Sequence, residues 1–150
     1  MSPRFPEFSR DMRAGEEGAV DDLLTRAYGD ASAARVIGDL RRSGLVAGEV
    51  VLPYRGTIVG YYALSRMQAP DDLLCVGPMA IDPDWQRAGH GRRLIGLLAE
   101  WARLTKQGVI AKGPQGFFLR AGFRSVADDI AIAGPERDLP ELRFPAALGR

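Results

Sequence analysis

The chain has 150 residues, 46% of them hydrophobic, which is enough for one domain with a buried core. A formal net charge of +1 argues against a dedicated nucleic-acid-binding protein, because neutralising many phosphates needs a clustered basic excess. One cysteine excludes an internal disulfide framework and a multi-cysteine zinc site, and we predict no metal. No apolar run has membrane-spanning length and the N-terminus lacks a signal-peptide core, so we expect a cytoplasmic protein without a membrane partner.

The first part of the chain predicts a strand, two helices and a hairpin. Residues 5–12 alternate weakly between polar and apolar and are expected to open a sheet. One helix is expected to begin after Gly15 and a second to cover 31–42, before strands over 45–52 and 57–64 pair as a hairpin. The inward residues are expected to be Val20, Leu23, Leu24 and Ala27 in the first helix and Val36, Ile37 and Leu40 in the second.

A strand predicted over 73–81 is interrupted by Gly77-Pro78. Proline cannot donate to a neighbouring strand and glycine tolerates a bulge, so we expect the sheet to part there. A helix from about Gly91 is predicted to bury one apolar stripe and to end at Gly108. That stripe would consist of Leu94, Leu97, Leu98, Trp101 and Leu104. The remaining elements are expected to be a strand over 109–111, a short helix over 117–120, a last strand near 130–133 and a tail, 134–150, ordered only by packing.

The run Gln86-Arg87-Ala88-Gly89-His90-Gly91-Arg92 lies between that strand and that helix. Two glycines let the backbone approach a bulky anion, and the first turn of a helix offers unpaired N–H groups and a favourable dipole. The spacing does not fit a Walker loop, and Leu94 stands where a dinucleotide-binding fingerprint needs its third glycine. The run therefore predicts a phosphate site of another kind.

The pattern Gln-Arg-x-Gly-x-Gly resembles the acyl-CoA pyrophosphate loop of the GNAT superfamily of N-acetyltransferases. The flanks match as well: residues 76–83 look like the strand that precedes this loop, and 117–123 are similar to the family's Tyr-x-x-x-Gly-Phe segment. Three motifs in the family's order are far more specific than a glycine pair.

The resemblance implies one α/β (α+β) domain over 1–150, with the GNAT fold. Its central sheet would be mixed, mostly antiparallel and splayed at the fourth and fifth strands, with about four flanking helices. Acetyl-CoA would be the acyl donor, and a primary amine of a small molecule, peptide or protein would attack the thioester directly. Dimerisation, common in the family, stays open.

The resemblance also implies the cofactor contacts. The backbone of Met79 and Ile81 would pair with the amides of pantetheine as an added strand would. His90 is expected to be a contact or an exposed side chain, remote from the thioester. The implied cofactor-binding residues are Met79, Ala80, Ile81, Gln86, Arg87, Ala88, Gly89, His90, Gly91, Arg92 and Phe118.

No catalytic residue is assigned. The family's tyrosine acid falls on Phe118, which cannot donate a proton, and the glutamate of the histone-modifying branch falls on Cys75. Glu49, Asp71, Asp72 or water could act as the base, although exposed carboxylates are commonly ordinary surface acids. Cys75 could form an acyl-enzyme, although a free cysteine is usually buried and inert.

Two alternatives to an enzyme stay open: a module that senses acyl-CoA without turnover, and a protein-interaction domain. The acceptor is not identified by the sequence. It would be recognised by the loop between the first two helices, the turn near Tyr54 and the tail. Tyr28, Tyr54, Tyr61 and Tyr62 could line its pocket, although such tyrosines are more often plain packing.

Overall fold

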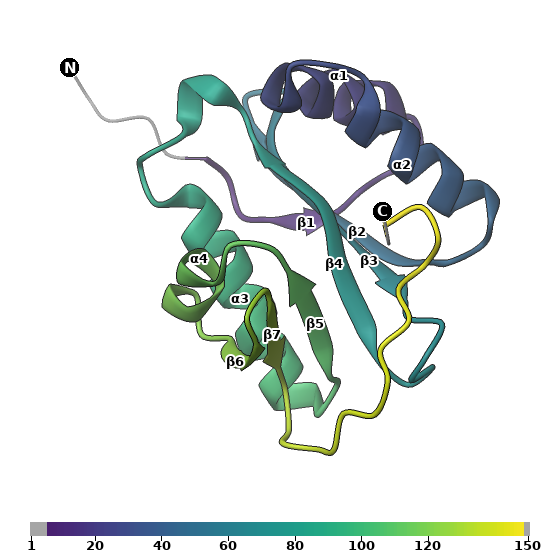
Figure 1. Ribbon diagram of the computed structural model, residues 1–150. Coiled ribbons are helices and arrows are strands. Elements are labelled where there is room, and N and C mark those ends of the chain that lie inside the picture. Colours follow the sequence, from purple (N-terminus) through teal and green to yellow (C-terminus); the bar gives the residue numbers. More distant parts are fainter. Residues whose placement is uncertain (1–5, 149–150) are drawn as a thin grey trace.

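The computed structural model describes residues 6–148 (Figure 1). Within this range one seven-stranded sheet has the strand order β1-β2-β3-β4-β5-β7-β6, with only β4 and β5 paired in parallel. The strands are β1 Arg10–Asp11, β2 Val46–Tyr54, β3 Thr57–Arg66, β4 Leu74–Ile81, β5 Val109–Lys112, β6 Arg124–Ala127 and β7 Ile130–Ala133. The helices are α1 Glu17–Tyr28, α2 Ser32–Arg42, the 3-10 turn η1 Pro83–Trp85, α3 His90–Thr105 and α4 Gln115–Arg120. The predicted mixed α/β architecture with four α-helices is confirmed.

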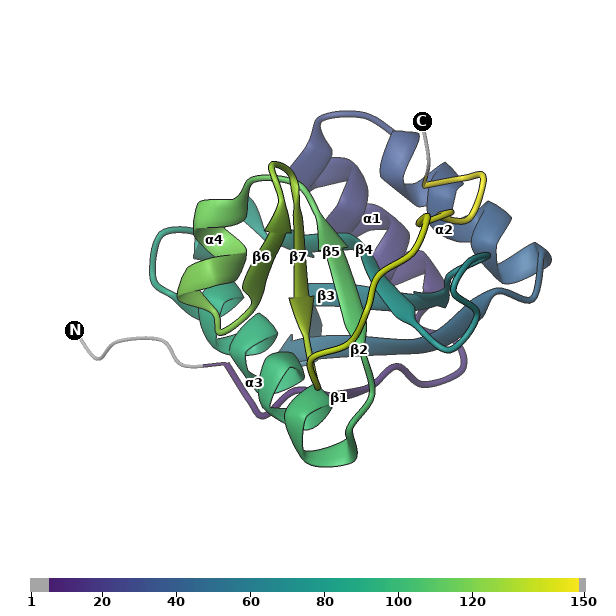
Figure 2. The same ribbon diagram turned by 60° about the horizontal axis from the view of Figure 1, so that its bottom comes forward.

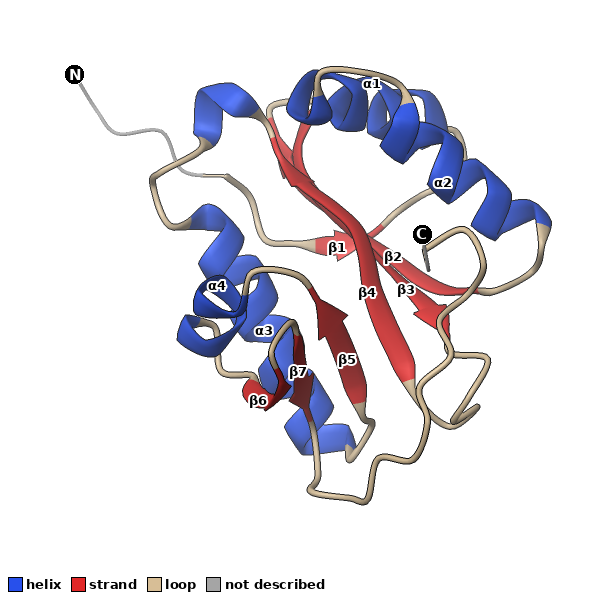
Figure 3. Ribbon diagram, in the orientation of Figure 1, coloured by secondary structure: helices blue, strands red, loops and turns tan. Residues whose placement is uncertain are grey.

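The two faces of the sheet are covered by different pairs of helices (Figures 1 and 3). Side chains alternate along β3, so Tyr61 packs in the core beneath α1 and α2, whereas Tyr62 packs in the core against α3. Eight consecutive residues of β3, from Ile58 to Ser65, are buried, because both of its faces are covered. Of the two interpretations that the sequence left for these tyrosines, packing is confirmed for Tyr61 and Tyr62, since both are core residues.

The first two helices follow the predicted pattern closely. Val20, Leu23, Leu24, Ile37 and Leu40 are buried in one cluster. The partly buried Ala27 and Val36 pack against that cluster. The first strand is shorter than predicted: β1 has two residues, and Phe5 lies outside the described part of the chain.

The buried face of α3 differs from the predicted stripe. Leu94 and Leu98 are buried as expected, but Leu97, Trp101 and Leu104 are exposed. The helix instead buries Ile95, Ala99 and Ala102, and the small side chains of the two alanines let it pack closely. It also ends earlier than predicted, at the left-handed residue Lys106 (φ 60°) rather than at Gly108.

The sheet parts at the predicted place. Between the pairs Tyr62–Met79 and Leu64–Val76, β4 has one residue more than β3, which is a bulge at Gly77-Pro78. Pairing of β4 with β5 stops at Cys75–Ile110. The rest of β4 therefore has an edge free of strand partners on that side.

The tail is held by more than packing, which corrects the sequence-based prediction. Arg143 exchanges backbone hydrogen bonds with Ala69, with N–O distances of 2.8 Å and 3.2 Å. Phe144 and Leu148 then pack against the cluster that contains Cys75. Figure 2 shows the tail crossing β5 and β4 toward α2. The final segment of the chain thus helps to build the surface beside the splayed strand.

Candidate active site

The predicted phosphate-binding run, residues 86–92, is held in shape by its own backbone and by side chains at the end of β4. Asp82 accepts a hydrogen bond from the Asp84 N–H (2.9 Å) and forms an ion pair with Arg26 of α1 (2.7 Å). The Gln86 amide donates to the Ile81 carbonyl at 3.0 Å. These contacts fix the chain between the end of the strand and the first turn of α3.

Two residues of the run have left-handed backbone conformations: Arg87 (φ 67°) and Gly89 (φ 82°). A left-handed residue followed by a helical one aims successive N–H groups into one concavity, which is a common anion site. Gly89 and His90 form such a pair. The first bond of α3 runs from the Arg93 N–H to the Gly89 carbonyl, so the N–H groups of residues 90–92 precede the helical ladder. The backbone thus offers convergent donors where the sequence predicts them.

A cavity of about 470 Å³ lies over this concavity. It includes Met79, Ala80, Ile81, Gln86, Arg87, Gly89, His90, Gly91 and Arg92 from the predicted cofactor set, together with Ala27, Tyr28, Trp85, Phe117 and Arg120. Ala88 is not among its lining residues. A Cβ added at Gly91 would lie 3.3 Å from the Ile81 side chain, which is a tight contact, and 3.6 Å from Phe117, which is an ordinary one.

Sequence reasoning missed Phe117 and Arg120 in this cavity. Both belong to α4, which is distant in sequence from the loop. The only sequence signal for Arg120 is its position two residues before Gly122, in the segment that resembles the family motif. That position does not show which way the side chain points. Arg120 therefore adds a third cationic side chain to those of Arg87 and Arg92 at the cavity.

His90 is buried rather than exposed, with 7% of its surface accessible. Its ring packs against Trp85 with centroids 5.5 Å apart, and the Arg93 guanidinium donates to its Nδ1 at 2.6 Å. That geometry fits a neutral imidazole, because a protonated Nδ1 could not accept. Within this structure His90 supports the start of α3 as well as lining the cavity.

The free edge of β4 carries carbonyls that are bound by side chains instead of by a strand. The Tyr28 hydroxyl donates to the Met79 carbonyl at 2.8 Å, and Gln86 binds the carbonyl of Ile81. In an extended strand the N–H and C=O of one residue point to the same side, so the N–H groups of Met79 and Ile81 face this edge too. A phenol has an ordinary pKa of about 10 and is protonated near neutrality, and partial burial of the half-exposed Tyr28 raises its pKa further. The edge is suited to receive an extended ligand.

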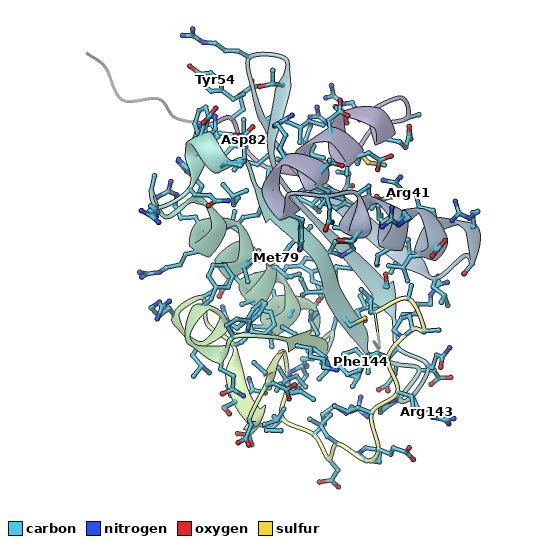
Figure 4. The ribbon with its side chains drawn as sticks, turned by 45° about the horizontal axis from the view of Figure 1, so that its top comes forward. Arg41, Tyr54, Met79, Asp82, Arg143 and Phe144 are labelled. Atoms are coloured by element: carbon cyan, nitrogen blue, oxygen red, sulfur yellow. The ribbon has the colours of Figure 1, made fainter. Side chains whose placement is uncertain are left out.

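A second cavity, of about 360 Å³, adjoins the first at Tyr28 and Met79, which line both. Its walls come from four separate segments: α1 to α2, the bulge of β4, the 112–118 region and the tail. The remaining lining residues are Ser32, Ala33, Val36, Val76, Gly77, Pro78, Lys112, Phe118, Phe144, Ala147 and Leu148. Figure 4 shows Met79 on the central strand and Phe144 on the tail. Phe118 therefore lies at this cavity and not at the one over the phosphate loop.

Glu49 lies in neither cavity. Its carboxylate accepts from Arg41 at 2.7 Å and from the Tyr61 hydroxyl at 2.6 Å, and its side chain is 12% exposed. Burial raises the pKa of the Tyr61 hydroxyl, and the neighbouring Glu49 carboxylate raises it further. Figure 4 places Arg41 on the helical layer that covers the sheet. Glu49 joins α2 to β2 and β3.

The other candidates for the base also lie apart from the two cavities. Asp71 and Asp72 are exposed, and Asp72 forms an ion pair with Arg137 of the tail. The Cys75 thiol is buried in the core and donates to the Ser65 carbonyl at 3.5 Å. Burial raises the pKa of this thiol to about 12, so almost no thiolate is present near neutrality.

Phe118 is 6% exposed and packs between Phe117 and Phe123, with ring centroids 5.2 Å and 5.5 Å away.

A larger hollow, of about 700 Å³, lies against the tip of the β2–β3 hairpin and contains no residue of the recognised motifs. Among residues 6–148, no helix is long and apolar enough to cross a membrane.

Comparisons with known proteins agree with this geometry. Residues 45–125, more than half of the chain, match the family model described as an acetyltransferase (GNAT) domain. The chain is 32% identical over 116 residues to YhbS of Escherichia coli strain K12, described as an uncharacterized N-acetyltransferase; the match covers 72% of this chain and 68% of YhbS.

Solved structures show the same fold. The structure of E. coli YhbS in complex with CoA superposes with a TM-score of 0.83 and 19% identity, covering 100% of this chain and 96% of that one. A GNAT family acetyltransferase from Brucella melitensis, in complex with acetyl-CoA, superposes with a TM-score of 0.81 and 20% identity, covering 93% of this chain and 96% of that one. By its matched domain, its similarity to YhbS and its fold, this chain belongs to the GNAT family of acetyltransferases.

Proposed function

We propose that this protein transfers an acetyl group from acetyl-CoA to a primary amine, by direct attack on the thioester. The observation that carries this is the pair of adjoining cavities on the free edge of β4, one over the phosphate loop and one beside the bulge. The solved neighbours that hold acetyl-CoA or CoA support this choice of donor.

The loop and the strand would divide the work of holding the donor. The N–H groups of residues 90–92, with Arg87 and Arg92, would hold the diphosphate. The N–H groups of Met79 and Ile81 would hold the extended arm and polarise the carbonyl under attack. Acetyl-CoA supplies the activated acyl group. The thioester would then lie near Met79, where the two cavities meet.

The reaction needs no strong acid at the leaving group. The amine nitrogen bonds to the carbonyl carbon, the C–S bond breaks, and its electron pair leaves with sulfur. A thiol has a pKa of about 8.5, so the departing thiolate is tolerable near neutrality without a tyrosine at position 118. The attacking nitrogen loses its proton to water, since none of the candidate carboxylates lines either cavity.

Calorimetric titration with acetyl-CoA tests the donor. The parent should bind, and Gly91→Glu should not, because a carboxylate would enter the phosphate site and the added Cβ presses on Ile81. A circular dichroism melt checks that the variant is folded. If neither the parent nor the variant binds acetyl-CoA, the donor assignment is wrong.

Incubation with radiolabelled acetyl-CoA and a broad panel of amines separates an enzyme from a sensor. Label transferred to an amine supports the enzyme, and tight binding of acetyl-CoA without transfer to any amine favours the sensing module.

A homodimer also stays a prediction. The exposed side chains of Leu97, Trp101 and Leu104 on α3 support it, and sedimentation of the parent and of Leu104→Glu tests it.

A further inference from the structure

The cavity beside the β4 bulge contains an unusual balance of charge for a site that accepts an amine. Among the described residues that line it, Lys112 is the only one with a charged side chain, and no carboxylate is present. A positive charge disfavours a protonated ammonium and favours a neutral amine or an anion. The cavity is therefore not built to attract a simple cationic amine.

Lys112 is an exposed residue at the end of β5, and its side chain contacts the tail. Its Nζ lies 5.5 Å from the centroid of the Phe144 ring, which is a cation–π contact. Phe144 follows directly after Arg143, whose backbone is bonded to Ala69. The ring is thus fixed by the sheet-like bridge between the tail and the 68–70 turn.

Within the described part of the chain, residues 6–148, no ion pair neutralises the positive charge of Lys112. None of the ion pairs formed between described residues includes Lys112. Lys112 also lines a neighbouring hollow together with Asp129 and Arg143. The negative charge of Asp129 in that hollow is therefore balanced by the positive charge of Arg143. Lys112 can therefore pair with an anionic group on a ligand.

The rest of the cavity is small, and apart from the hydroxyl-bearing Tyr28 and Ser32 its lining side chains are apolar. The larger apolar ones include Val36, Phe118 and Phe144, and a volume of about 360 Å³ suits a small molecule. The thioester would occupy the Met79 end, so the acceptor amine must lie there while its other end reaches Lys112.

On the basis of the proposed function, we infer that the acceptor is a small amine joined through an apolar body to a carboxylate, which Lys112 binds. Lys112 is a specificity-determining residue in this assignment. The tail takes part by placing Phe144 against both the lysine and the apolar body.

The test uses two probes that differ only in charge: 4-(aminomethyl)benzoate and 4-(aminomethyl)benzamide. Both carry the same benzylic amine on an aromatic body. Binding of each is measured by calorimetry to the CoA-loaded protein and to the free protein, and acetylation is measured as kcat/KM. The parent should prefer the benzoate by about two- to fivefold in affinity and in kcat/KM, as expected for an ion pair with an exposed lysine.

Three variants sharpen the assignment. Lys112→Met should remove the preference through the affinity and KM for the benzoate, with little change in kcat for the benzamide. Lys112→Arg should retain it. Lys106→Met, which removes the same charge outside both cavities, should leave the preference intact.

Equal binding of the two probes by the parent would overturn the inference, as would a preference that survives Lys112→Met. Loss of the preference in Lys106→Met would also count against it, since bulk charge would then explain the result. Failure of the proposed function looks different: acetyl-CoA would not bind, although the preference for the benzoate in the free protein would still be measurable.

Discussion

The two adjoining cavities are built in different ways. The cavity over the phosphate loop is formed largely by one continuous stretch, from Met79 to Arg92, with α4 and the end of α1 closing it. The cavity beside the bulge is assembled from segments that are far apart in sequence, including the tail. The cavity over the phosphate loop depends on backbone conformation, so a sequence motif can predict it. The second depends on which side chains the fold brings together.

The same contrast separates the polar side chains that are proposed to bind a ligand from those that hold the fold. Arg92 is exposed at a cavity, whereas Glu49 and Cys75 are enclosed by protein. Carboxylates and thiols in a sequence invite a catalytic interpretation, yet Glu49 and Cys75 make structural contacts inside the protein. Substitutions at these positions test that division.

The largest effect is expected for the reactivity of Cys75. Because burial raises the pKa of its thiol from 9.0 to about 12, the thiolate fraction near pH 8 should be about 1,000-fold lower than in the unfolded chain. Labelling with a chromogenic disulfide reagent, in buffer and in denaturant, measures this. Cys75→Ser should retain acetyl transfer, whereas loss of transfer with an intact fold would revive the acyl-enzyme.

Glu49→Ala should lower the free energy of unfolding by about 2 to 3 kcal/mol, because Arg41 and the Tyr61 hydroxyl lose their shared partner inside the protein. Urea denaturation measures the change. Asp39→Ala, which breaks the exposed ion pair with Arg42, serves as the control and should cost less than about 0.5 kcal/mol. Normal stability combined with lost turnover would instead identify Glu49 as the base.

Arg92→Ala should weaken acetyl-CoA binding by roughly tenfold, about 1.4 kcal/mol, because one cation at the phosphate site is lost. Arg103→Ala, on the same helix and distant from both cavities, should leave the dissociation constant unchanged. Titration calorimetry compares the two. An equal loss in both variants would point to the overall charge of α3 rather than to the loop.

Phe118→Tyr should have the smallest effect, with turnover similar to the parent or higher. The ring already lines the second cavity, and the added hydroxyl could serve the departing sulfur. Steady-state kinetics and a melting curve check this. A collapse in turnover with intact acetyl-CoA binding would show that the site requires an apolar residue at this position.

Much of the fold was predictable because its signals are local. The spacing of Val20, Leu23 and Leu24 identifies α1 and its buried face, and Gly77-Pro78 marks the bulge where β4 leaves its neighbour. The α3 stripe was wrong because periodicity alone does not distinguish Leu97 from Ile95. Which side of a helix is covered depends on what packs against it.

By itself the sequence determined the phosphate loop, since glycines, a helix start and a preceding strand shape the backbone without distant partners. Only the tertiary structure decided the second cavity, where Tyr28, Lys112 and Phe144 meet across α1, β5 and the tail. It also placed Glu49 and Cys75 within the packed protein. The physical reason is that side-chain burial and contact depend on packing between distant segments, and residue type alone does not specify that packing.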